Sequence, residues 1–189
     1  MADAALRRAP LAPEALPAPR GGPVLSLAAP MARFIFRGQS REATICGGTF
    51  GPALARDACR ASDEGGRAAL WLGPDEWLLL AHESEGGMAR EAMESALKGL
   101  PHSLTDVSHR QTGIEIRGAR AAALLNSHCM LDLDEAAFPT GMCTRTLFAK
   151  AEIVLWRRAA DHFHIEVWRS FAPYMAGLLG EAALDIGDE

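Results

Sequence analysis

Two short apolar runs separated by a turn sequence constrain the fold of this chain more than any other feature. The runs span residues 68–72 and 77–81, and Gly73-Pro74-Asp75-Glu76 lies between them. Proline pre-sets the backbone angle at the first central position of a β-turn. The pattern therefore predicts a β-hairpin in the first half of the chain.

An alternating segment at residues 32–37 predicts a further strand. Phe34 and Phe36 fall on one face of this segment, and Arg33 falls on the other. Successive side chains of a strand point to opposite faces, so this alternation is typical of a sheet with one apolar face. We expect residues 41–46 to continue the same sheet.

The rest of the first half combines a loop with a helix. Residues 47–66 are rich in glycine, alanine and charged residues, which predicts mostly loop. Apolar residues then recur at helical spacing over residues 88–98, and their polar neighbours fall on the opposite face. Gly99 and Pro101 follow, so we expect the helix to end there.

The second half repeats the pattern of short strands and helices. Ser170 is the predicted N-cap of the last helix, which carries an apolar stripe that we assign mostly to the core, and Pro173 is tolerated in its first turn. The expected strands lie at residues 112–117, 144–149, 152–157 and 162–168, and the expected helices at residues 119–128 and 171–182.

These elements predict an α+β protein with two lobes. Each lobe is an antiparallel sheet with helices packed on one side, as in paired ferredoxin-like lobes. We expect the lobes to span residues 31–105 and 106–189. Residues 1–30 contain six prolines and no clear periodicity, so we expect a Pro/Ala-rich arm that is mobile or ordered against a partner.

The overall charge and composition exclude several classes of function. The formal net charge of −5 argues against nucleic-acid binding, which usually requires a basic surface. No apolar stretch is long enough to predict a membrane span. The four cysteines form no Cys-x-x-Cys pair, so we expect free thiols and a cytoplasmic location.

One strand carries residues that resemble a metal-binding set. His162, His164 and Glu166 alternate along it and fall on the same face, and two histidines with a carboxylate form a known catalytic metal set. The alternative, which we favour, is an exposed polar face on a strand whose other face is apolar.

Two further groups of residues offer possible catalytic chemistry. Asp106, Ser108 and His109 contain the residue types of a hydrolase triad, but triad members normally approach from separate segments. Cys129 follows His128 at the end of a predicted helix, where the helix dipole disfavours a thiolate. We therefore interpret the first group as a loop or an interface and Cys129 as a buried structural thiol.

Several short motifs follow one another in a characteristic order and spacing. They are Leu72-Gly73-Pro74-Asp75-Glu76-Trp77-Leu78, Asp106-Val107-Ser108-His109-Arg110, Ile114-Glu115-Ile116-Arg117-Gly118, Leu131-Asp132-Leu133, Phe138-Pro139-Thr140-Gly141, Arg145-Thr146-Leu147 and Trp168-Arg169-Ser170-Phe171. In this order and spacing the chain resembles the gamma subunit family of heterotetrameric sarcosine oxidase, over about residues 30–185.

This resemblance implies a non-catalytic accessory subunit that assembles with alpha, beta and delta subunits. The family's complete enzyme oxidatively demethylates sarcosine to glycine and forms peroxide and methylenetetrahydrofolate. The resemblance places FAD, FMN, NAD, tetrahydrofolate and zinc on the partner subunits and none of them on this chain. It also implies lobes similar to the folate-binding lobes of the glycine-cleavage aminomethyltransferases.

Seven motif residues are the candidates for a partner interface or for hydrogen bonds specific to the family. Arginine suits such sites because its planar guanidinium binds carboxylates in a fixed geometry. The alternative function is a free-standing folate-binding or aminomethyltransferase-like protein, although the chain is short for one. The candidates are Trp77, Asp106, His109, Arg110, Arg145, Trp168 and Arg169.

Overall fold

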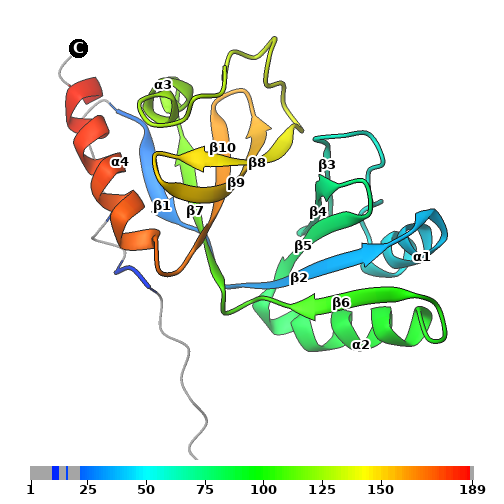
Figure 1. The fold of residues 1–189 in the computed structure, drawn as a ribbon. Helices are drawn as coiled ribbons and strands as arrows, with labels where there is room; N and C mark the ends of the chain where they lie inside the picture. The colour runs from blue at the N-terminus through cyan, green and yellow to red at the C-terminus, as the bar shows by residue number, and fades with distance from the viewer. Residues whose placement is uncertain (1–9, 13–15, 17–21, 188–189) are drawn as a thin grey trace, which may run out of the picture.

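The computed structural model describes residues 10–12, 16 and 22–187 of the chain, and it contains two antiparallel β-sheets with helices (Figure 1). None of the helices in this described part is long and apolar enough to cross a membrane. The helices are α1 (Ser40–Phe50), α2 (Gly86–Ala96), α3 (Ala121–Asn126) and α4 (Ala172–Gly187), with a 3₁₀ turn η2 (Glu83–Glu85). The strands are β1 (Val24–Leu27), β2 (Met31–Gly38), β3 (Ala61–Glu64), β4 (Arg67–Gly73), β5 (Glu76–His82), β6 (His102–Asp106), β7 (Gln111–Arg117), β8 (Cys143–Phe148), β9 (Ala151–Ala159) and β10 (His162–Trp168).

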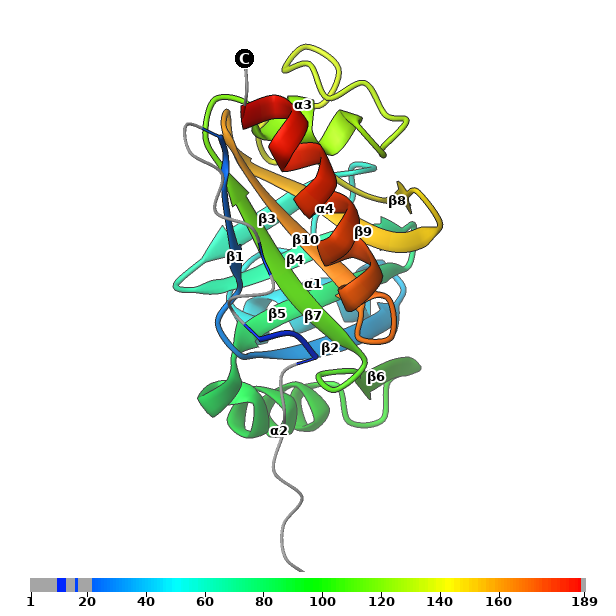
Figure 2. The same ribbon diagram turned by 90° about the vertical axis from the view of Figure 1, so that its left-hand side faces the viewer.

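Each sheet has five strands, and helices cover one of its faces. The first sheet has the order β3-β4-β5-β2-β6 and packs against α1 and α2. The second has the order β1-β7-β10-β9-β8 and packs against α3 and α4, with α4 lying in front of this sheet in Figure 2. The predicted α+β fold of two antiparallel sheets with helices on one side is therefore confirmed.

The predicted hairpin forms the centre of the first sheet. Strands β4 and β5 pair antiparallel with Leu70 opposite Leu78, and the turn falls where the sequence predicts it. Trp77 and Leu79 point into the core shared with α1 and α2, whereas Leu78 and Leu80 belong to a separate core between the sheets. Both faces of the hairpin are buried, which explains its continuous apolar sequence.

The core between the sheets joins the two lobes. Leu78 and Leu80 of the first sheet share it with Val154 and Trp156 of the second. The opposite face of the second sheet, which includes Phe163, packs against α3 and α4. The molecule thus has four layers, in the order helices, sheet, sheet and helices.

The prediction for residues 41–66 was wrong in two places. Residues 41–46 lie in α1 and do not continue the sheet, and residues 47–66 contain the end of α1 and all of β3. Ala43, Cys46 and Phe50 recur at helical spacing and are buried against the first sheet. This apolar face stabilises the helix, since packing contributes more to helices than intrinsic propensity does.

Part of the predicted arm belongs to the second sheet. Residues 24–27 form β1, which pairs antiparallel with β7, and Leu11 and Leu16 are buried in the core of the second lobe. The segment around residues 24–27 is therefore a strand and not an arm. The rest of the prediction falls largely on residues 1–9, 13–15 and 17–21, outside the described residues, and the division at residues 30 and 105 stays a prediction.

The start of the last helix differs from the prediction by one residue. Helix α4 begins at Ala172, and the Met175 amide donates to the Phe171 carbonyl over 2.9 Å. Phe171, and not Ser170, therefore occupies the N-cap position. Pro173 lies in the first turn, as predicted.

Candidate functional site

A buried ion pair connects the two sheets. Arg33 on β2 donates from Nε to Glu166 Oε2 on β10 over 2.6 Å and from Nη2 to Glu166 Oε1 over 3.0 Å. Both side chains are almost fully buried, and Arg33 Nη1 also donates to the Met31 carbonyl. Because a single buried charge is costly, each partner requires the other in the folded state.

His164 extends this ion pair along the second sheet. Its Nε2 lies 2.9 Å from Glu166 Oε1, and its Nδ1 lies 2.8 Å from Glu115 Oε1. Burial would lower the pKa of His164, but the hydrogen bonds and charges of Glu115 and Glu166 outweigh it and raise the pKa to about 9. The ring is therefore an imidazolium that donates from both nitrogens.

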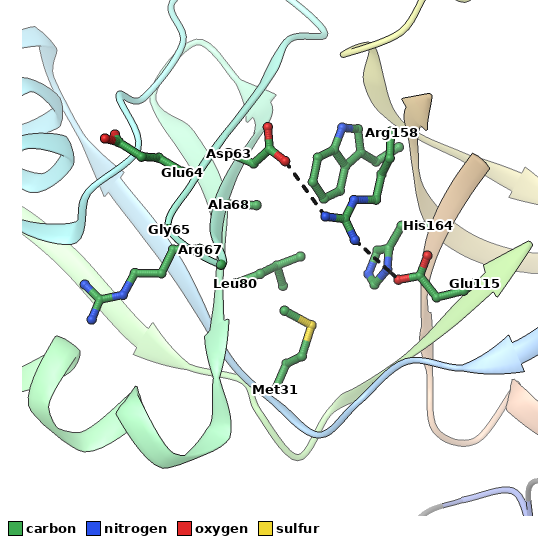
Figure 3. A pocket seen from close by; sticks show the side chains of 12 residues that line it. Met31, Asp63, Glu64, Gly65, Arg67, Ala68, Leu80, Glu115, Arg158 and His164 are labelled. Atoms are coloured by element: carbon green, nitrogen blue, oxygen red, sulfur yellow. Dashed lines mark hydrogen bonds and ion pairs between the residues drawn. The ribbon is translucent and has the colours of Figure 1, made fainter. Parts of the chain in front are cut away.

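Glu115 continues the network to a cavity between the lobes. Its Oε2 contacts His162 Nε2, and its Oε1 lies 3.8 Å from Arg158, which lies equally far from Asp63 on β3 (Figure 3). Burial would raise the pKa of Glu115, but the hydrogen bonds and charges of His164 and His162 lower it to about 2. The cavity has a volume of about 250 Å³ and is also lined by Trp156 and Met31.

The side chains of this network form hydrogen bonds and ion pairs with one another, which leaves few groups free to act on a substrate. His164 uses both ring nitrogens on carboxylates, so neither nitrogen can ligate a metal or accept a proton. No group of three or more histidine, cysteine, aspartate or glutamate side chains in the described part of the chain could hold a metal ion. The favoured interpretation of His162, His164 and Glu166 as an exposed polar face was wrong, because His164 and Glu166 are buried against the first sheet.

The other candidate catalytic residues bind backbone groups or lie in the core. Asp106 accepts a hydrogen bond from the Ser108 amide, and Ser108 Oγ accepts one from the Arg33 amide, so both side chains bind backbone groups. Cys129 is buried in the core of the second lobe, which fits the expected structural thiol.

Three of the predicted interface residues line one small hollow on the surface. Arg110, Arg145 and Trp168 surround a volume of about 60 Å³, although they come from three separate segments. The Arg110 guanidinium lies 5.4 Å from the Trp168 ring centroid, a cation–π distance. Arg145 pairs with Glu76 of the first sheet over 3.4 Å.

The remaining predicted residues lie elsewhere. Trp77 is buried, and its indole nitrogen donates to the Ala55 carbonyl over 2.8 Å. Asp106 ends β6, His109 lies in the turn that follows, and both are exposed. The Arg169 amide donates to the Arg110 carbonyl, which places Arg169 next to the Trp168 hollow. The interface role of the seven candidates stays a prediction.

Sequence reasoning missed several residues beside Trp168. Phe171 and Tyr174 were assigned to the core stripe of the last helix, yet they are 40% and 39% exposed. Phe171, Leu147 and Lys150 line a second hollow of about 190 Å³ that also contacts Trp168. For Phe171 and Tyr174, the signal in the sequence was their position at the start of α4, because the buried part of the apolar stripe begins with Met175.

Two stacked sheets with outer helices and a cavity between the lobes define a class of fold. The glycine cleavage system aminomethyltransferase T from Bartonella henselae has this fold over 88% of this chain and 50% of its own, with a TM-score of 0.63 and 16% identity. The expected aminomethyltransferase-like architecture is therefore confirmed at the level of the fold.

The sequence defines the family within this class. The family model described as "Sarcosine oxidase, gamma subunit family" matches residues 54–185, and the chain belongs to that family. The sarcosine oxidase gamma subunit of Corynebacterium sp. strain P-1 is 31% identical over 66% of this chain. That of an Arthrobacter species is 35% identical over 53% of it. These matches span 60% and 48% of the two relatives, less than two thirds of either.

A solved assembly contains a similar chain. A chain of the heterotetrameric sarcosine oxidase from Corynebacterium sp. U-96, solved with pyrrole 2-carboxylate, matches 96% of this chain and 96% of its own length. The TM-score is 0.87 and the identity is 25%. The likeness thus extends over both sheets.

Proposed function

We propose that this chain is a non-catalytic accessory subunit of a heterotetrameric sarcosine oxidase, which demethylates sarcosine oxidatively to glycine. Its partners are the alpha, beta and delta subunits, which carry the FAD, FMN, NAD, tetrahydrofolate and zinc. The observation that carries the proposal is the match to almost the whole of a chain in a heterotetrameric sarcosine oxidase.

The chemistry of the buried network supports an accessory role. Arg33, His164 and Glu166 have each other as partners and are shielded from solvent. Catalytic acids and bases must reach a substrate and change protonation during turnover. The paired buried residues therefore stabilise the contact between the two sheets. The accessory role is performed by the surface of the chain.

The cavity between the lobes favours a second candidate, a free-standing folate-binding protein. Its walls combine the Trp156 ring with the Arg158 and Glu115 side chains, which suits a flat polar ligand, and the fold is that of an aminomethyltransferase. Arg158 narrows the cavity through its pairs with Asp63 and Glu115, so we place this function second.

Co-expression distinguishes the two functions. A tagged copy of this chain is expressed with the alpha, beta and delta chains of its own organism, purified, and assayed for bound flavin and for sarcosine-dependent peroxide. The accessory role predicts a yellow four-chain complex. A colourless single chain that binds tetrahydrofolate in a calorimeter would overturn it in favour of the second function.

We also place the protein in the cytoplasm. The described cysteines, Cys46, Cys59, Cys129 and Cys143, carry free thiols, and a reducing compartment maintains thiols in this state. The proposal predicts that the assembly is recovered from the cytoplasmic fraction of its native cell. Recovery with the membrane or periplasmic fraction would contradict it.

A further inference from the structure

Four large apolar side chains are exposed together around the start of α4. Leu147, Trp168 and Phe171 line the same hollow and are 56%, 42% and 40% exposed, and the Tyr174 ring lies 6.4 Å from that of Phe171. We call these four residues the aromatic surface. Clustered exposed apolar side chains mark interaction sites, and tryptophan and tyrosine are frequent anchors at interfaces.

Other exposed apolar residues are not clustered in this way. Val24, Met88, Met130 and Leu184 are more exposed than Trp168, but they line neither of the two hollows beside it. A single exposed apolar side chain is ordinary on a protein surface. The aromatic surface is therefore distinguished by the shared hollow and not by exposure alone.

The charges beside the aromatic surface are mainly positive. The ionisable residues that line the two hollows are Arg110, Arg145, Lys150 and Glu152, in a chain whose net charge is −5. Arg110 and Lys150 form no ion pair with a carboxylate of the described residues. Complementary charge guides association, so a partner surface that carries carboxylates suits this one.

A buried amide beside Trp168 gives an independent indication of a ligand. Gln111 is only 4% exposed and lies between the hollow formed by Arg110, Arg145 and Trp168 and a neighbouring hollow lined by Arg33 and Arg169. Its Oε1 has no hydrogen-bond donor among the described residues. An unsatisfied buried oxygen is destabilising, so a partner group that donates a hydrogen bond to it stabilises the complex.

We propose that the aromatic surface, with Arg110 and Lys150 beside it, docks a partner subunit that inserts an aliphatic or aromatic side chain between carboxylates. This inference rests on the proposed accessory function and names the face through which it is performed. The hollow of about 190 Å³ receives the inserted side chain, and its walls are the Trp168 and Phe171 rings and Leu147.

Phe171 is the most informative position for a test. It occupies the N-cap of α4, where aspartate is among the most favourable residues, so Phe171→Asp preserves the helix. Met88→Asp is the matched control, because Met88 is exposed in the first turn of α2 on the other lobe. Leu147→Asp is a second variant of the same surface, and it lies on the edge strand β8 and not at the start of a helix.

The experiment measures assembly with identified partners. Each tagged variant is co-expressed with the alpha, beta and delta chains, and the co-purified partners are quantified by mass spectrometry. Phe171→Asp and Leu147→Asp are expected to lower the recovered partners at least about tenfold, while Met88→Asp equals the wild type. Melting curves of the isolated chains establish that each variant is folded.

The outcomes separate this inference from the proposed function. A wild-type chain that recovers no partner overturns the accessory role itself. Partner recovery by folded Phe171→Asp and Leu147→Asp at the wild-type level overturns only the docking face. A wild-type dimer in light scattering that Phe171→Asp converts to a monomer, with partner recovery unchanged, assigns the surface to a second copy and also overturns the inference.

Discussion

The buried network between the sheets and the aromatic surface differ in how far their side chains are exposed to solvent. Arg33, His164 and Glu166 are buried and mutually paired, whereas Trp168 and Phe171 are about two-fifths exposed. The residues with the most distinctive chemistry thus serve the fold, and those with ordinary apolar side chains face outward. A polar cluster indicates catalysis only when some of its members remain available to a ligand.

The largest expected effect on stability comes from breaking the ion pair that joins the sheets. Glu166→Gln leaves Arg33 and the His164 imidazolium buried without the shared carboxylate, so we expect a loss of about 3–5 kcal/mol in the free energy of unfolding. Urea denaturation measures this loss. Glu76→Gln is the matched control, because it breaks the more exposed pair with Arg145 and should cost less than about 1 kcal/mol.

Equal effects of Glu166→Gln and Glu76→Gln would break the comparison. They would mean that the buried pair contributes no more than a surface pair, and that the lobes are held together by the apolar core between the sheets alone.

A smaller effect is expected from crowding the network. A Cβ at Gly113 would lie 2.9 Å from His164 Cε1 and 2.7 Å from the Ala28 Cβ, closer than carbon atoms approach. Gly113→Ala should therefore destabilise the chain by about 1–3 kcal/mol. Gly87→Ala in α2 is the control, because its Cβ meets no atom within 4 Å and alanine favours a helix. Denaturation curves in which Gly113→Ala is as stable as Gly87→Ala would show that the network is loosely packed.

The pH dependence of stability sharpens the comparison further. The His164 pKa rises from 6.5 to about 9 on folding, so its contribution is complete below pH 6.5 and is lost as the pH rises toward 9. The Glu115 pKa falls from 4.5 to about 2, so its contribution is complete above pH 4.5 and is lost as the pH falls toward 2. The melting temperature should therefore decrease by several degrees between pH 6.5 and 9. His164→Gln should flatten this decrease, and an unchanged slope would contradict the assigned charge.

The sequence predicted the elements whose side chains alternate clearly. The hairpin of β4 and β5 and the strands β7 to β10 fall within a few residues of their expected positions. Helix α1 was missed because Thr44, Ile45 and Gly47-Gly48 weaken its helical propensity, and packing against the first sheet outweighs that weakness. Strand β1 was missed because it is only four residues long and pairs with a strand far along the chain.

The site was less predictable than the fold because its contacts are distant in sequence. Arg33 and Glu166 are 133 residues apart, and strand alternation cannot reveal that a polar face is covered by another sheet. The motif residues Arg110, Arg145 and Trp168 were identified, but the apolar neighbours that complete the surface were not. Phe171 and Tyr174 fit a helical stripe equally well whether they are buried or exposed.

Hydrogen–deuterium exchange of this chain, alone and within the co-expressed assembly, tests the central claim most directly. The account predicts that assembly slows exchange at residues 145–150 and 168–175, while the amides around Arg33 and His164 exchange slowly in both states. The opposite pattern, with slower exchange around Met88 and no change at residues 145–150 and 168–175, would contradict docking through the aromatic surface.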